Sequence, residues 1–147
     1  MSYTARNKST GFTLIELMVT TAIVAILSAI AIGAYGNYIR SSKLSESFAM
    51  LGDYRLKMEQ FKQDNRSYAD SLNPNTCGIA LPTSSKYFDF SCTIAAAGTQ
   101  FTATAANKAG TGLGNAADYS YSIDQDGAQN TQKFAGSVGP NGSWRNK

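Results

Sequence analysis

The 147-residue sequence contains no histidine, and this absence removes several classes of enzyme at once. Histidine is the usual general base in proteins and the partner of the serine or cysteine nucleophile. Without it, neither a Ser/His/Asp nor a Cys/His arrangement can form, and a zinc site loses one of its main ligand types. No paired-acid arrangement is evident either, so the sequence predicts a protein that is not an enzyme and uses no cofactor or metal.

The sequence also has only two cysteines and a small net charge. Cys77 and Cys92 are the only cysteines, and they lack the CxxC spacing of a metal or redox site. If the domain is exported, the two thiols are expected to form one disulfide; the alternative is two buried free thiols in a reducing cytosol. The net charge is only +3, and Arg6 and Lys8 contribute to it near the N-terminus, so bulk charge does not indicate a nucleic-acid partner.

What the sequence does have is a long apolar run near its N-terminus. No charged residue occurs from Leu17 to Ile39. As a helix this stretch would reach about 34 Å, which is enough to cross a bilayer core. A secretory signal peptide would have a shorter apolar region followed by a cleavage site, so we expect this segment to be retained as a membrane helix.

Small residues recur within the apolar run. Ala25, Ala29 and Gly33 are spaced by four positions, which places them on one helical face where neighbouring helices can approach closely. The alternative is that alanine is simply common in such helices. Gly33 and Gly36 each weaken a helix by about 1 kcal/mol relative to alanine, so local melting in an assembly is expected there.

Glu16 stands in the first part of the apolar segment and requires an explanation. A lone carboxylate in a membrane segment is costly and usually has a partner or a function. No basic residue lies within a helical turn of Glu16 in the intact chain. Cleavage between Gly11 and Phe12 would create a positively charged α-amino group one turn away, on this copy and on every neighbouring copy. We therefore predict that cleavage supplies the partner of Glu16.

A short polar leader ending in Gly11 and followed by FTLIELMV resembles the N-terminus of a type IV prepilin. The resemblance implies that a prepilin peptidase cuts between Gly11 and Phe12 and methylates the Phe12 amine. It also implies that Glu16 neutralises the amine of a neighbouring subunit and sets the register as subunits assemble. The family often has proline at the position of Gly33, and its absence here removes the usual cause of a fixed kink in the helix.

The chain beyond Arg40 continues the helical pattern and then changes to strands. Apolar residues recur every three or four positions up to Phe61, which predicts an amphipathic helix continuous with the membrane segment, and turn formers at 64–68 end it. Alternating residues predict strands in the segments 87–95, 100–106 and 119–123, and a fourth that ends near Phe134.

The expected fold is therefore α+β, a pilin fold in which one long helix packs on a four-stranded antiparallel sheet. Cys77 in the helix-to-sheet loop would be joined to Cys92 in the first strand. The expected segments are a leader peptide at 1–11, a hydrophobic transmembrane or filament-core helix at 12–40, the amphipathic half of the helix at 41–66, and the globular remainder at 67–147.

Two further segments have competing interpretations. In SIDQDGAQNTQK the acids partly match a calcium loop, but Lys133 occupies the position that needs a bidentate acid, so a hairpin turn is expected. The tail places Trp144 beside Arg145 and Lys147, and aromatic and basic residues together can bind DNA. The alternative for the tail is that Trp144 covers the sheet edge and the charges are solvated.

The function predicted from these features is that of a structural subunit of a type IV pilus, nearest to minor pilins, serving adhesion, twitching motility or DNA uptake. The resemblance implies an inner-membrane subunit with a periplasmic domain that later joins an extracellular filament. Its expected partners are other pilin subunits, the prepilin peptidase, the inner-membrane assembly platform and the membrane itself. The alternatives are a DNA-binding pilus subunit for competence and a pseudopilin of a type II secretion machine.

Overall fold

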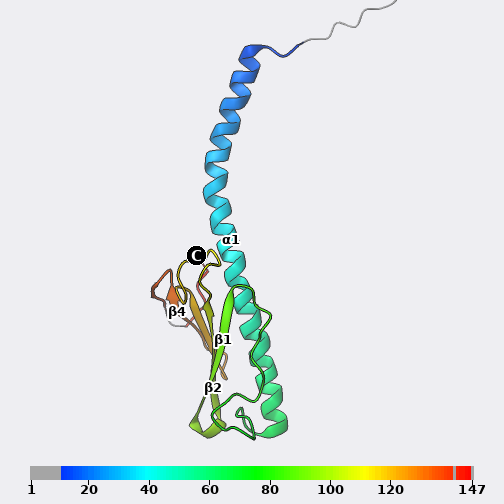
Figure 1. The fold of residues 1–147 in the computed structure, drawn as a ribbon, viewed down its shortest axis with the longest axis vertical. Helices are drawn as coiled ribbons and strands as arrows, with labels where there is room; N and C mark the ends of the chain where they lie inside the picture. Colours follow the sequence, from blue (N-terminus) through cyan, green and yellow to red (C-terminus); the bar gives the residue numbers. More distant parts are fainter. Residues whose placement is uncertain (1–10, 141, 147) are drawn as a thin grey trace, which may run out of the picture. The chain divides into compact units, whose positions relative to one another are not determined.

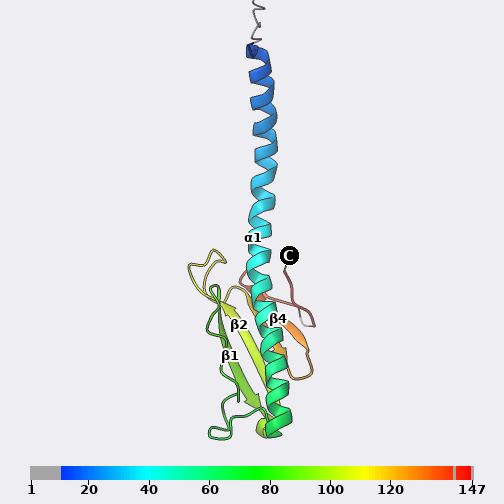
Figure 2. The same cartoon turned by 90° about the vertical axis from the view of Figure 1, so that its right-hand side faces the viewer.

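The computed structural model describes residues 11–140 and 142–146, and the chain divides into two compact units, residues 1–37 and 38–147. Figures 1 and 2 show the elements in two views. They are the helix α1 (Leu14–Asn65), the strands β1 (Phe88–Ala95), β2 (Gln100–Asn107), β3 (Ser120–Asp124), β4 (Gln129–Phe134) and β5 (Ser137–Val138), and the short 3-10 helix η1 (Ala96–Gly98). The chain is thus α+β, as predicted.

Helix α1 has 52 residues and ends where the turn-forming residues begin. Arg66 follows with a φ of 60°, the left-handed conformation that commonly ends a helix, and its N–H donates to the carbonyl oxygen of Lys62. No proline interrupts the helix. The prediction of one continuous helix of about this length is confirmed.

The sheet has the strand order β1-β2-β3-β4-β5, and every neighbouring pair is antiparallel. The prediction of four strands is therefore short by one. The additional strand, β5, has two residues and pairs through Lys133 with Val138 and through Phe134 with Ser137. Two residues are too few for an alternating pattern to be visible in the sequence.

The core of the 38–147 unit lies between α1 and the inner face of the sheet. The helix contributes Leu44, Leu51, Tyr54 and Met58, which recur at helical spacing and are almost fully buried. The sheet contributes the inward positions of its strands, with Phe88, Phe101, Ala103, Ala105, Tyr121 and Ile123 among them. Phe48 is half-buried and meets the Tyr121 ring edge-on at 4.8 Å between centroids.

The connection between β3 and β4 is a tight turn. A carboxylate oxygen of Asp124 accepts the N–H groups of Asp126 and Ala128 at 3.0 and 2.8 Å, so it is used inside the turn. Gly127 has a φ of 80°, which favours glycine. The predicted hairpin turn is confirmed, and Arg55 of α1 fastens it by donating to the Gln125 carbonyl oxygen at 3.2 Å.

Candidate assembly motif and DNA-contact residues

The start of α1 is held by a reciprocal pair of side chains. The Glu16 carboxylate accepts hydrogen bonds from the Thr13 N–H at 3.2 Å and from the Thr13 hydroxyl at 3.1 Å. In return, the Thr13 hydroxyl oxygen accepts the N–H of Glu16 at 3.3 Å. This is a capping box, which satisfies two N–H groups that the first turn of a helix leaves without partners.

The capping box gives Glu16 a role within its own chain that our reading of the sequence missed. The signal was present, because a threonine followed three residues later by a glutamate before an apolar run is the pattern of a capping box. A carboxylate here also lies at the positive end of the helix dipole, which lowers the cost of its charge. Both capping contacts of Glu16 come from Thr13, and Glu16 remains exposed.

Gly11 and Phe12 precede the helix in backbone that is neither helix nor strand. The Phe12 side chain is 82% exposed, and no atom lies within 4 Å of the place that a side chain on Gly11 would occupy. The bond between these two residues is therefore open to another protein. Arg6 and Lys8 of the leader lie outside the described residues.

The apolar residues of unit 1–37 have no covering partner within the described chain. Their large side chains from Leu14 to Ile32 are between 52% and 76% exposed. The helix is long and apolar enough to cross a membrane, with a mean hydropathy of 2.3 over its most apolar window. Ala25 and Ala29 are exposed, and a side chain placed at Gly33 or Gly36 would meet nothing within 4 Å.

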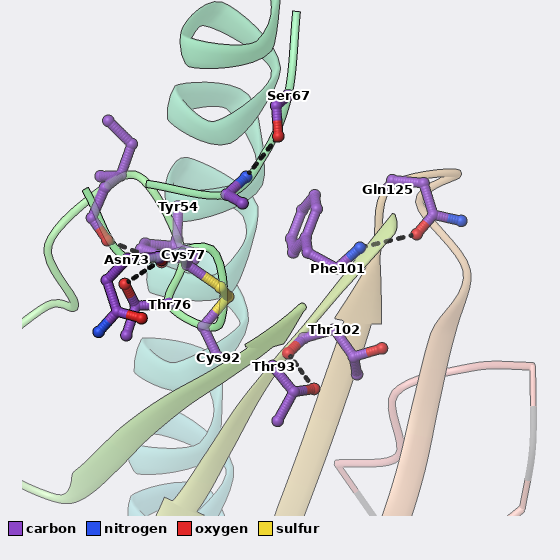
Figure 3. The surroundings of a disulfide bond; sticks show 12 residues. Tyr54, Ser67, Asn73, Thr76, Cys77, Cys92, Thr93, Phe101, Thr102 and Gln125 are labelled. Carbon is purple, nitrogen blue, oxygen red and sulfur yellow. Dashed lines mark hydrogen bonds between the residues drawn. A yellow bond between two sulfur atoms is a disulfide. The ribbon is translucent and has the colours of Figure 1, made fainter. Parts of the chain in front are cut away.

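Cys77 and Cys92 form a disulfide, as predicted (Figure 3). It joins the loop that follows α1 to the middle of β1, an edge strand, opposite Ala103 of β2. The Tyr54 hydroxyl of α1 donates to the carbonyl oxygen of Ile79 in the same loop at 2.9 Å. Because burial disfavours the phenolate, the pKa of Tyr54 is raised to about 12, and the hydroxyl keeps its proton at physiological pH.

The C-terminal tail packs onto the 38–147 unit. The Trp144 indole stacks on Phe48 with 5.0 Å between ring centroids, and its N–H donates to the Ser122 carbonyl oxygen at 3.0 Å. The backbone of Arg145 is held by Thr131 and by the Tyr121 hydroxyl. One face of the indole is therefore occupied by a ring of its own chain. Lys147 lies outside the described residues.

Arg145 is exposed, and its guanidinium lies 4.7 Å from the centroid of the Phe134 ring. Of the residues proposed for DNA contact, Arg145 thus presents a charge at the surface while Trp144 lies against Phe48.

A second basic group, which the sequence did not indicate, surrounds Tyr87. The Lys43 ammonium from α1 lies 5.3 Å from the ring centroid of Tyr87, and the Lys86 ammonium lies 5.6 Å from it. The Lys108 backbone N–H donates to the Tyr87 carbonyl oxygen at 2.9 Å. We call these three lysines and Tyr87 the Tyr87 cluster. Its lysines are far apart in the sequence, so only the fold brings them together.

The described part of the chain contains no group of three or more His, Cys, Asp or Glu side chains that could hold a metal ion. The described surface carries exposed apolar side chains and charged side chains. Such a surface can bind and pack against partners.

Comparison with known proteins first defines the class. Residues 6–32 match the prokaryotic N-terminal methylation motif, the stretch that contains Gly11, Phe12 and Glu16. Together with the α+β fold, this match places the chain among the type IV pilins, which are filament subunits. The chain belongs to the family described as type IV minor pilin ComP, DNA uptake sequence receptor, whose model matches residues 33–118.

Curated relatives agree with this class. The chain is 39% identical to the fimbrial protein EcpC of Eikenella corrodens over 67% of its own length and 62% of that protein. It is 40% identical to a type IV major fimbrial protein FimA of Dichelobacter nodosus over 68% of the chain and 58% of that protein. It is 41% identical to the prepilin peptidase-dependent protein D of Escherichia coli over 55% of each. The matches thus span less than two thirds of these relatives, and no solved structure matches the chain.

Proposed function

We propose that this chain is a minor subunit of a type IV pilus, cut between Gly11 and Phe12, methylated at Phe12 and then assembled through the apolar segment of residues 12–37. The observation that carries the proposal is the capped apolar helix whose side chains are uncovered. Such a surface needs a bilayer before assembly and neighbouring helices after it, because leaving it in water would forfeit about 25 cal/mol for each Å² of apolar surface.

In the proposed assembly, Glu16 exchanges partners. Before assembly its carboxylate accepts from Thr13, which reduces the cost of carrying a charge near a membrane surface. After cleavage the Phe12 amine of a neighbouring subunit adds a positive partner, whose Coulomb attraction to the carboxylate the neutral donors of Thr13 do not supply. Ala25, Ala29, Gly33 and Gly36 allow neighbouring helices to approach in the filament core.

Intact-mass spectrometry of the protein from membranes and from sheared filaments tests this proposal, with Gly11→Ala beside the wild type. A filament species that begins at methylated Phe12, absent from the variant, is expected. An uncut chain confined to membranes would contradict it. Glu16→Gln separates the two roles of this residue: we expect it to be cut normally but to be depleted from filaments.

The proposed location is the inner membrane with the 38–147 unit in the periplasm, followed by the extracellular filament. The disulfide supports this side of the membrane, since disulfides persist in oxidising compartments. The prepilin peptidase and an inner-membrane assembly platform are the partners that this route requires. The fimbrial relatives favour a pilus over a type II secretion machine.

A second candidate function is the capture of double-stranded DNA, supported by the description of the matching family. Arg145 at the described surface and Lys147 are the proposed phosphate contacts, with Trp144 holding the tail in place. Retardation of a DNA duplex by the full chain in detergent tests this candidate. Loss of retardation in Arg145→Ala/Lys147→Ala would support contact through the tail, and unchanged retardation would remove it.

A further inference from the structure

The 38–147 unit has two ends with different charge. One, which we call the Tyr38 end, contains the first turns of α1 in this unit. The strands at this end are paired through Phe88 with Asn107 and through Ser120 with Lys133. The other, the Asn65 end, contains the last turns of α1 and the level at which Ala95 pairs with Gln100. Hydrogen bonds from α1 show which part of the helix lies beside each end of the sheet.

These contacts are specific. At the Tyr38 end, Glu46 of α1 accepts from the Ser85 hydroxyl at 2.7 Å, immediately before β1. At the Asn65 end, Arg55 of α1 donates to Gln125 in the β3–β4 turn. The two ends are therefore defined by contacts between the helix and the sheet within the 38–147 unit.

Charge is segregated between the two ends. Among the described residues, the Tyr38 end has six basic residues (Arg40, Lys43, Lys86, Lys108, Lys133, Arg145) against three acidic ones (Glu46, Asp89, Asp118). The described residues of the Asn65 end include four basic ones (Arg55, Lys57, Lys62, Arg66) against six acidic ones (Asp53, Glu59, Asp64, Asp70, Asp124, Asp126). One end of a nearly neutral unit is therefore positive and the other negative, an arrangement that favours one orientation at a charged surface.

The Tyr87 cluster contains three of the cations of the Tyr38 end. Two ammonium groups lie near one aromatic ring, and Lys108 donates to the Ser85 carbonyl oxygen at 2.9 Å. The nearby acids cancel part of this charge, since Asp89 lies 3.5 Å from Lys108 and Glu46 accepts from Ser85, but two carboxylates against three lysines leave the cluster positive. An anion beside the Tyr87 ring would be attracted by the ammonium groups of Lys43 and Lys86, which both lie near this ring.

The chain itself keeps this end close to the proposed membrane segment. Lys43 follows Asn37, the last residue of the apolar unit, by six residues, which even fully extended span only about 20 Å. Tyr35 and Tyr38 are 66% and 70% exposed at this point of the helix, and tyrosines are enriched at the headgroup level of membranes. A tether this short gives the cluster a high effective concentration at the bilayer surface, whereas DNA would have to diffuse to it.

We infer that the Tyr38 end is a lipid-docking surface, in which Lys43, Lys86 and Lys108 bind the phosphates of anionic phospholipid headgroups before the subunit is assembled. This inference rests on the proposed membrane insertion of the apolar segment. Docking holds the 38–147 unit on the bilayer with its acidic Asn65 end facing away. Assembly into the filament then breaks these contacts, so anionic lipid retains the unassembled subunit.

Lysine reactivity in the full chain tests the docking surface. The chain is placed in lipid nanodiscs of phosphatidylcholine, with or without a third of phosphatidylglycerol, and briefly acetylated; mass spectrometry gives the labelling rate of each lysine. We expect Lys43, Lys86 and Lys108 to react about five-fold more slowly in the anionic discs, the factor that about 1 kcal/mol per lysine implies. Lys57 and Lys62 of the Asn65 end serve as internal controls whose rates stay unchanged.

A matched pair of variants and salt complete the experiment. Lys86→Gln removes an exposed charge and should lower the affinity of the surface for anionic lipid about five-fold, so that the other two lysines lose most of their protection, whereas Lys57→Gln, at the other end, should leave it unchanged. Raising the salt to about 1 M, where the Debye length is about 3 Å, should abolish protection in the wild type.

The remaining outcomes distinguish lipid docking from membrane insertion, on which it rests, and from DNA binding by the same cluster. A chain that fails to co-elute with neutral discs would overturn both membrane insertion and docking. Co-elution without protection by anionic lipid, or equal protection of every lysine, would overturn docking alone. A short DNA duplex is added to neutral discs in a parallel sample. If it protects the Tyr87 cluster while anionic lipid does not, the cluster is a DNA surface and the lipid inference is wrong.

Discussion

Replacement of Trp144 decides between a packed and a ligand-binding tail. Truncating a large buried aromatic side chain costs about 3–5 kcal/mol, and because Trp144 is only half-buried, the lower limit applies. We expect Trp144→Ala to lower the free energy of unfolding by about 3 kcal/mol and Tm by about 12 °C. Trp144→Phe keeps a ring against Phe48 and loses the hydrogen bond to Ser122, so it should cost about 1 kcal/mol.

Thermal unfolding of the full chain in detergent micelles, followed by near-ultraviolet circular dichroism, measures these differences. Arg145→Ala is the control from the same tail, because it removes an exposed charge and should change stability by less than about 1 kcal/mol. If Trp144→Ala unfolds at the wild-type temperature, the stack on Phe48 does not exist in solution and the reasoning fails. If it also loses DNA binding without losing stability, Trp144 contacts DNA directly.

Three further predictions concern the 38–147 unit. Cys77→Ser opens a 15-residue loop and should cost about 3 kcal/mol in urea unfolding; an equal loss on reducing the wild type is the check. Gly139→Ala should lower the free energy of unfolding by about 2 kcal/mol, because the new methyl group would collide with the Thr131 carbonyl oxygen. Gly52→Ala in α1 would meet no atom and should raise the free energy of unfolding by about 1 kcal/mol. Equal Tm values for the two variants would contradict this. Burial raises the pKa of Tyr54 from 10.0 to about 12. In an alkaline titration, the stability gained by burying the neutral phenol should therefore be complete below pH 10 and be lost as the pH rises through about 12. If the protein unfolds before Tyr54 ionises, the ionisation of Tyr54 is not the cause of alkaline unfolding.

The sequence by itself determined the N-terminal motif and the secondary structure, because both depend on residues near one another in the chain. Gly11, Phe12 and Glu16 are read directly as a motif, and the apolar period carries α1 through to Asn65. Strands β1 to β4 follow from alternation between polar and apolar residues, which is a local property. The capping box was equally local, and its Thr13 could have been recognised from spacing alone.

Only the tertiary structure decided where separate parts of the chain meet. Lys43, Lys86 and Lys108 come from a helix, a loop and a strand end, and antiparallel pairing of Phe88 with Asn107 is what brings the last two together around Tyr87. The tail illustrates the same limit: the sequence left open which side chain Trp144 contacts, and only the fold places one face of its indole against Phe48 from α1. Such contacts depend on the register of the sheet and the seating of the helix on it, and neither is encoded within any short window of residues.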